Sequence, residues 1–202
     1  MGRVLRRVGR VGKRAQRSER GAALVEAALI IPLILLIVFG AIEYGFAFKD
    51  AAAVAGAARS GARIASAEPR DPNMPQDAAT AVATALHNFP HVPSPEIWVY
   101  LSGDNGYPLG TSNFASCGLD CVKYTTTWNT STDSFQLNTP TGSIPINDEH
   151  VCPTDSAATW SRVGVYVKAT HQKIITNLLP SPTTLTDHAV FRLEPVLSSK
   201  CP

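Results

Sequence analysis

A block of basic residues followed at once by a long apolar run is the feature that most constrains this chain. Residues 1–20 hold eight basic side chains and one acidic side chain, Glu19, for a net charge of +7, whereas the other 182 residues sum to −5. This order is the positive-inside signature, so we predict that residues 1–20 stay in the cytoplasm and that the chain beyond Phe48 lies across the membrane. The basic residues are Arg3, Arg6, Arg7, Arg10, Lys13, Arg14, Arg17 and Arg20.

The apolar run, Ala22–Phe48, is interrupted only by Glu26 and Glu43. Its charge-free stretch Ala27–Ile42 has 16 residues, and the small and aromatic residues at either end extend it to the ~20 that a transmembrane helix needs. Pro32 removes one backbone donor, so we expect it to kink the helix or to melt it locally.

The N-terminus has two other possible interpretations. A basic arm can bind nucleic acid, but the membrane segment that follows directly accounts for the charge, so we predict no nucleic-acid partner. A conventional secretory signal, cut near residues 51–53, is the second alternative. The apolar run is longer than usual for such a signal, and Glu26 precedes it.

The alanine-rich segment Asp50–Ala67 has no proline and good helix propensity. One helix from Ala22 to about Ser66 would be ~67 Å long. Its Gly56, Ser60 and Gly61 offer small side chains for the close approach of another helix. A plain single-pass anchor with a helical neck is the simpler alternative.

Beyond this helix, the segment Glu68–Pro75 is a predicted linker with three prolines, and Gln76–Phe89 is a predicted short helix. Ile174–Leu179 is expected to be an apolar loop or a short helix.

Alternation of polar and apolar residues favours an antiparallel sheet with one solvated face. The predicted strands are Glu96–Leu101, Lys123–Thr127, Ser134–Leu137, Ser161–Thr170 and Asp187–Leu197.

We therefore predict an α+β fold, in which a long N-terminal transmembrane and stalk helix is followed by a small antiparallel β-sheet domain with disulfide-stapled loops. The predicted divisions are a basic cytoplasmic leader at residues 1–21, a transmembrane helix at 22–48, a helical neck at 49–68 and an extracytoplasmic α+β domain at 76–202. Ion pairs between the neck and the last strand are also expected, among Arg59, Arg63, Arg192 and Glu194.

All four cysteines, Cys117, Cys121, Cys152 and Cys201, lie in the predicted extracytoplasmic part. An even number of cysteines outside the cytoplasm favours disulfides over free thiols. Three connectivities are possible, and we favour Cys117–Cys121 with Cys152–Cys201 because a three-residue spacer can close a small loop. The spacing fits no standard zinc module.

No catalytic constellation is present: the chain has no GxSxG, no HExxH, no phosphate-binding loop and no dinucleotide fingerprint. The five histidines are scattered, and Asp148-Glu149-His150 is expected to be a solvated turn rather than a metal site. We therefore predict a protein that is not an enzyme, with no catalytic, cofactor or metal site and no small-molecule substrate.

The junction Arg20-Gly21-Ala22-Ala23-Leu24-Val25-Glu26 resembles the cleavage site of type IV prepilins. The resemblance implies cleavage by a prepilin peptidase between Gly21 and Ala22, with Glu26 as the fifth mature residue. It also implies that the Glu26 carboxylate pairs with the new α-amine of Ala22 on a neighbouring subunit, which would offset the desolvation of both charges.

The chain is also similar to the TadE-like proteins of the tight-adherence (Tad/Flp) pilus system. This resemblance implies a minor pilin or pseudopilin, held in the cell membrane or in the pilus, that helps to assemble a pilus for adhesion and has other pilin subunits as partners. Tyr100–Thr159 is not covered by it, and Ala27 stands where the family often has an aromatic residue. The matching segments are Arg20–Leu33, Phe39–Gly45, Ala57–Ala65 and Val190–Pro195.

A single-pass, membrane-anchored envelope or binding protein that never joins a filament is the main alternative. Cleavage at Gly21 together with recovery in sheared filaments would favour the pilin, and an intact N-terminus in the membrane fraction would favour the envelope protein.

Overall fold

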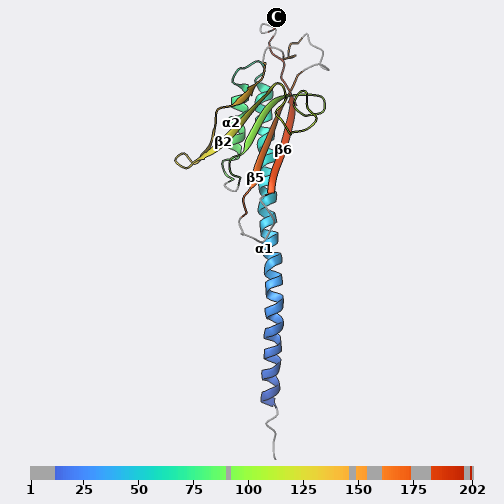
Figure 1. Ribbon diagram of the computed structural model, residues 1–202, viewed down its shortest axis with the longest axis vertical. Coiled ribbons are helices and arrows are strands. Elements are labelled where there is room, and N and C mark those ends of the chain that lie inside the picture. The colour runs from blue at the N-terminus through green and yellow to red at the C-terminus, as the bar shows by residue number, and fades with distance from the viewer. Residues whose placement is uncertain are drawn as a thin grey trace, which may run out of the picture.

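The computed structural model describes residues 12–89, 92–145, 149–153, 161–173, 183–197 and 201. Figure 1 shows a small head at one end of a helix that projects far beyond it. The helices are α1 (Gly12–Ala67) and α2 (Met74–Ala85), and the strands are β1 (Glu96–Ser102), β2 (Cys121–Asn129), β3 (Ser134–Leu137), β4 (Thr141–Ser143), β5 (Arg162–His171) and β6 (Thr183–Arg192).

Helix α1 has 56 residues, which corresponds to about 84 Å at 1.5 Å per residue. The continuous helix predicted from Ala22 to Ser66 is present and begins earlier, at Gly12. Pro32 lies inside it without interrupting it (Figure 1), so the expected local melting does not occur. A lost backbone donor at one position leaves the neighbouring turns of the helix intact.

The two halves of α1 have different surroundings. In the lower half, residues 21–42 are mostly exposed and apolar, with Leu24 72% and Leu29 74% exposed, and by length and composition the helix can cross a membrane. The upper half, predicted as a neck, places Val54, Ala58 and Ala62 in the hydrophobic core of the head. These residues therefore complete the folded head.

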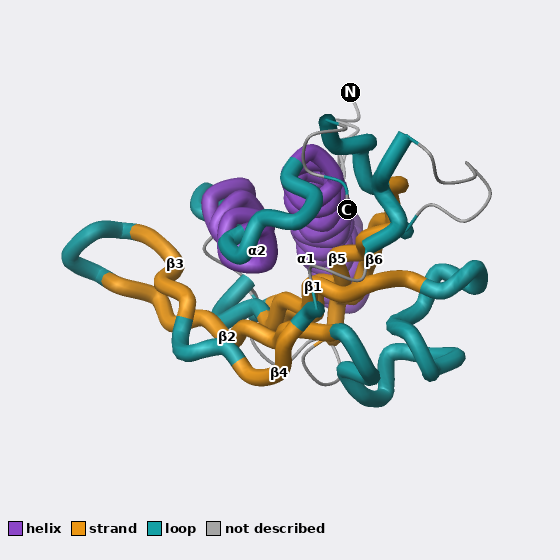
Figure 2. Tube along the Cα trace, turned by 90° about the horizontal axis from the view of Figure 1, so that it is seen from above, coloured by secondary structure: helices purple, strands orange, loops and turns teal. Residues whose placement is uncertain are grey.

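The strands form one antiparallel sheet in the order β3-β2-β1-β5-β6, and β4 also pairs with β2. Helices α1 and α2 lie side by side on one face of it (Figure 2). At the centre of the sheet, Ile97 faces Val167 and Val99 faces Val165. The α+β class and the antiparallel sheet are thus confirmed.

The prediction of one solvated sheet face is wrong at the centre of the sheet. Trp98, Tyr100 and Tyr166 point away from the helices and are also buried, because the loop between β1 and β2 folds over them. The Phe114 ring from this loop stacks on Tyr166, with ring centroids 4.2 Å apart. Gly164 leaves the room that the Tyr100 ring occupies, since a Cβ atom there would collide with it.

The bounds of helix α2 and of strand β6 differ from the sequence prediction at both ends. Helix α2 begins at Met74, inside the predicted linker, because Pro75 suits the first turn of a helix, and it ends at Ala85, before Phe89. Strand β6 begins at Thr183, four residues earlier than predicted, and it ends at Arg192.

The short strand β4 was not predicted. All three of its residues, Thr-Gly-Ser, are exposed, so it has no apolar alternation to reveal it. The predicted loop or helix at Ile174–Leu179 lies outside the described residues.

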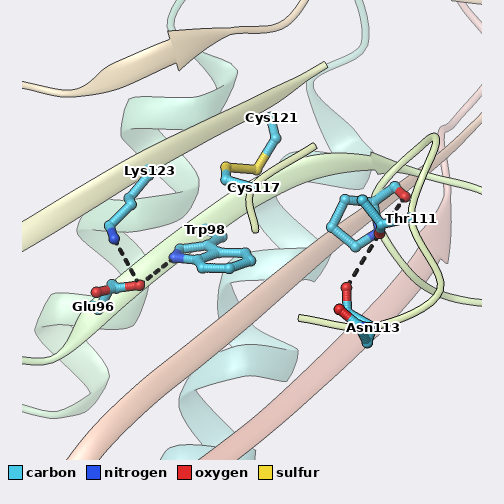
Figure 3. Close-up of a disulfide and its surroundings, with 8 residues drawn as sticks. Glu96, Trp98, Thr111, Asn113, Cys117, Cys121 and Lys123 are labelled. Carbon is cyan, nitrogen blue, oxygen red and sulfur yellow. Dashed lines mark hydrogen bonds and ion pairs between the residues drawn. A yellow bond between two sulfur atoms is a disulfide. The ribbon is translucent and has the colours of Figure 1, made fainter. Parts of the chain in front are cut away.

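The structure forms the two disulfides that the sequence favoured, Cys117–Cys121 and Cys152–Cys201, which together use every cysteine of the chain. The first closes the loop that covers Trp98 (Figure 3), and the Trp98 indole donates to Glu96, which also pairs with Lys123. The second disulfide spans 49 residues, so it removes more conformational entropy from the unfolded chain than the first does. In the chain-entropy treatment, it stabilises the fold by about 4 kcal/mol, against about 2 kcal/mol for Cys117–Cys121.

Candidate functional sites: the processing junction and the helix–head cluster

The predicted processing residues lie at the lower end of α1, far from the head. Gly21, Ala22 and Glu26 are helical and exposed, and the space beside Gly21 is open. The backbone continues as helix from Gly12 through this point, so the bond between Gly21 and Ala22 lies inside a helical segment. Within the described part of the chain, the Glu26 side chain makes no hydrogen bond or ion pair, so a partner for its carboxylate would have to come from outside the chain.

A second group of chemically active residues joins α1 to the head. His171, the last residue of β5, lies between two carboxylates of α1, with Nδ1 2.7 Å from Asp50 Oδ2 and Nε2 3.4 Å from Glu43 Oε1. All three side chains are 3% exposed. Glu43 and Asp50 are seven residues apart, or two helical turns, so they share one face of α1. We call these three residues the helix–head cluster.

The geometry of the helix–head cluster suits an anchor point rather than a reaction centre. The two imidazole nitrogens point in opposite directions, and each meets a different carboxylate, so one metal ion could not bind both. When both nitrogens carry a proton, His171 donates to Asp50 at short range and to Glu43 at longer range. These two contacts fix the end of β5 against α1, because His171 is a shared partner of two buried carboxylates and the removal of one partner from such a contact is costly.

Sequence reasoning missed the helix–head cluster. In the sequence, Glu43 stands out only as an interruption of the apolar run, and His171 only as one of five scattered histidines. The available signal was the seven-residue spacing of Glu43 and Asp50 on one helix face. Nothing in the sequence pointed to the histidine, which is 121 residues from Asp50.

Glu149 is buried, so the expectation of a solvated Asp148-Glu149-His150 turn is wrong for this residue; Asp148 lies outside the described residues. The backbone N–H of Arg70 donates to Glu149 Oε2 at 2.7 Å, and the Arg70 guanidinium donates to the Glu149 carbonyl oxygen at 3.2 Å. Burial raises the pKa of the Glu149 carboxyl to about 7, although Arg70 acts in the opposite direction. An open cavity of about 510 Å³ lies beside Arg70, lined in part by Glu68 and Glu194.

The expected ion pairs between the upper part of α1 and the last strand do not form among the described residues. Arg59 and Arg63 are exposed and face away from the core. The backbone makes this connection instead: the N–H of Glu194 donates to the carbonyl oxygen of Ser66 at 2.8 Å. In the same described ranges, no group of three or more His, Cys, Asp or Glu side chains is arranged to hold a metal ion.

The fold and these sites define a class: an α+β protein whose head is built around the upper end of one helix, the lower end of which is long and apolar enough to cross a membrane. Residues 21–63 match the sequence model of the family described as TadE-like protein, which identifies this stretch as TadE-like. No curated protein and no solved structure matches the chain.

The matched stretch begins at Gly21 and ends within the upper part of α1. It contains the predicted processing junction and both carboxylates of the helix–head cluster, whereas His171 lies outside it. The resemblance of Val190–Pro195 to the family therefore stays a prediction.

Proposed function

We propose that the protein is a minor pilin or pseudopilin that takes part in the assembly of a Tad/Flp-type pilus, with a structural rather than a catalytic role. The TadE-like match over residues 21–63 carries this proposal, because it begins at the glycine of the predicted processing site. The apolar, exposed residues 21–42 of α1 support a partner that is a membrane or other apolar helices.

In this proposal, a prepilin peptidase cleaves between Gly21 and Ala22. Cleavage creates a positively charged amine at Ala22, four residues from Glu26. A carboxylate in hydrocarbon costs roughly 2.5–3.5 kcal/mol on insertion scales, and pairing with a neighbouring subunit's amine would offset part of this cost. The exposed Glu26 side chain, which has no partner in the described part of its own chain, is available for such pairing.

The N-terminus is proposed to be cytoplasmic and the head extracytoplasmic. The eight basic residues of the leader support this orientation through the positive-inside rule. The two disulfides of the head support it as well, because such bonds persist in oxidising compartments.

The test is mass spectrometry of the N-terminal peptide, with the full chain expressed beside its native peptidase and pilus components. We expect a mature chain that begins at Ala22 and that is found in sheared filaments. Glu26→Ala should be processed but should lose most of its incorporation, whereas Leu29→Ala, at a nearby exposed position, should keep it.

A chain that keeps residues 1–21 and stays in the membrane fraction would overturn the proposal. The protein would then be a single-pass, membrane-anchored envelope or binding protein that does not enter a filament.

A further inference from the structure

The helix–head cluster fixes where the hydrocarbon of the membrane must end. His171 is the last residue of β5, and it contacts α1 as far down as Glu43. Strand ends and loops carry unpaired backbone groups, which cannot face lipid hydrocarbon. The hydrocarbon must therefore end below Glu43, rather than near Phe48 as the apolar run alone predicted.

The length of α1 below this point is that of a membrane span. Ala22–Ile42 contains 21 residues, which corresponds to about 31 Å of helix. The hydrocarbon core of a typical bilayer is about 30 Å thick. A span that ends at Ile42 therefore fills the membrane and leaves no length of bare helix between the bilayer and the head.

The residues just above Ile42 suit the headgroup layer. Tyr44 and Phe48 are 56% and 74% exposed although they lie at the base of the folded head. Aromatic side chains gather at this depth in membrane proteins. Lys49 follows, and its ammonium group lies 5.5 Å from the centre of the Phe89 ring, so the turn after α2 also reaches this level.

We propose that the head is seated directly on the bilayer and that its base is a lipid-binding surface, with Tyr44, Phe48 and Lys49 in the headgroup layer. The partner is the lipid surface that continues from the transmembrane span. This inference depends on membrane insertion of α1 and not on pilus assembly, so it can fail or hold separately from the proposed function.

Depth measurements with single spin labels test the seating. The four native cysteines are paired in disulfides, so an introduced cysteine provides the only free thiol for a nitroxide label. The full chain is placed in phosphatidylcholine bilayers, and the accessibility of the label to oxygen, which enriches in lipid, is compared with that to a water-soluble nickel chelate. Phe48→Cys reports the proposed headgroup layer, with Ile37→Cys as the membrane control and Ile64→Cys as the aqueous control on the same helix.

A second pair of labels reports the head itself. Thr184 and Arg192 are exposed and lie on the same face of β6, near its two ends, and Thr184 pairs with Thr170 next to His171. Thr184→Cys should therefore lie close to the headgroups, whereas Arg192→Cys should lie about 27 Å further along the strand, in water. Both positions are on the surface, so the labels leave the core of the head unchanged.

We expect the Phe48 and Thr184 labels to show accessibility between those of the Ile37 and Ile64 labels, and the Arg192 label to match Ile64. Full aqueous accessibility at Phe48 and Thr184 would overturn the proposal, because the head would then stand clear of the bilayer. Spin–spin broadening at Phe48, with little access for either reagent, would also overturn it, since a second copy of the chain rather than lipid would cover the base.

Discussion

Single buried polar residues determine where this head meets its helix. His171 is 3% exposed, yet both of its ring nitrogens have carboxylate neighbours on α1. A purely apolar contact at this place would hold the same two elements together without fixing their register, because apolar packing is non-directional. The helix–head cluster therefore specifies how far up α1 the sheet is placed.

We expect His171→Ala to destabilise the head strongly, because it leaves the carboxylates of Asp50 and Glu43 buried without their shared partner. Breaking a buried pair in this way costs about 3–5 kcal/mol. Thermal unfolding of the full chain in nanodiscs measures the loss, and His150→Ala, at an exposed position, is the matched control. Equal melting temperatures for the two variants would contradict this role of His171.

Glu149 makes a prediction about pH. Its folded pKa of about 7 lies above the ordinary value of 4.5, so the folded head holds this proton more tightly than the unfolded chain does. The contribution of this group to stability is therefore complete below pH 4.5 and is lost as the pH rises from about 4.5 to about 7. Burial also raises the pKa of Glu68, which acts in the same direction.

The measurement compares the wild type with Glu149→Gln, which keeps the shape of the side chain and has no charge. Unfolding experiments at pH 5 and at pH 7.5 should show a smaller loss of stability for the variant. An identical loss in both proteins would mean that Glu149 does not titrate in this range.

At the scale of elements, α1 and α2 approach each other closely at one glycine. A Cβ atom on Gly61 would lie 2.5 Å from Val82 Cγ2 and 3.0 Å from the carbonyl oxygen of Ala78, both on α2. The space beside Gly56, one and a half turns earlier on α1, is open. Of the three small residues expected to allow close helix approach, Gly56 and Ser60 are exposed, and Gly61 alone lies in the contact.

We expect Gly61→Ala to destabilise the head by about 1–3 kcal/mol, the usual cost of overpacking. Gly56→Ala adds the same methyl group to the same helix without a clash, and it should be neutral or stabilising by up to about 1 kcal/mol through helix propensity. Denaturant unfolding of both variants measures the difference. The interpretation fails if the two substitutions change stability in the same direction.

Periodicity and the location of the cysteines are enough to predict much of this fold. The long helix and the antiparallel sheet follow from patterns that are local in sequence, and the short spacing of Cys117 and Cys121 favoured the cysteine pairing that the structure forms. The covering of Trp98, Tyr100 and Tyr166 could not be predicted, because the loop that buries them has no apolar pattern of its own. The helix–head cluster could not be predicted for a related reason. In the sequence, His171 is 121 positions from Asp50 and 128 positions from Glu43.

For the whole molecule, the anchor and the head share one helix, so the head cannot be separated from it at a conventional linker. Val54, Ala58 and Ala62 of α1 are core residues of the head. A fragment that starts at Glu68 would leave their contacts on α2 and the sheet open to water.

We therefore expect residues 49–202, expressed in an oxidising compartment, to fold with a cooperative unfolding transition, although without the contact from Glu43. Residues 68–202 should not fold. Circular dichroism and the dispersion of amide signals in NMR spectra distinguish the two fragments. A cooperative transition in the shorter fragment would show that the upper part of α1 is dispensable.

The unbroken course of α1 has a geometric consequence for any assembly. Successive residues of an α-helix are rotated by about 100° around its axis, so the 17 residues from Glu26 to Glu43 place these two carboxylates about 260° apart in azimuth. Since Glu43 is fixed to the head, the direction in which Glu26 points also sets the direction in which the head faces. A neighbour that engages the base of the helix thereby selects one side of the head, and the deletion of one residue between them would turn that side by about 100°.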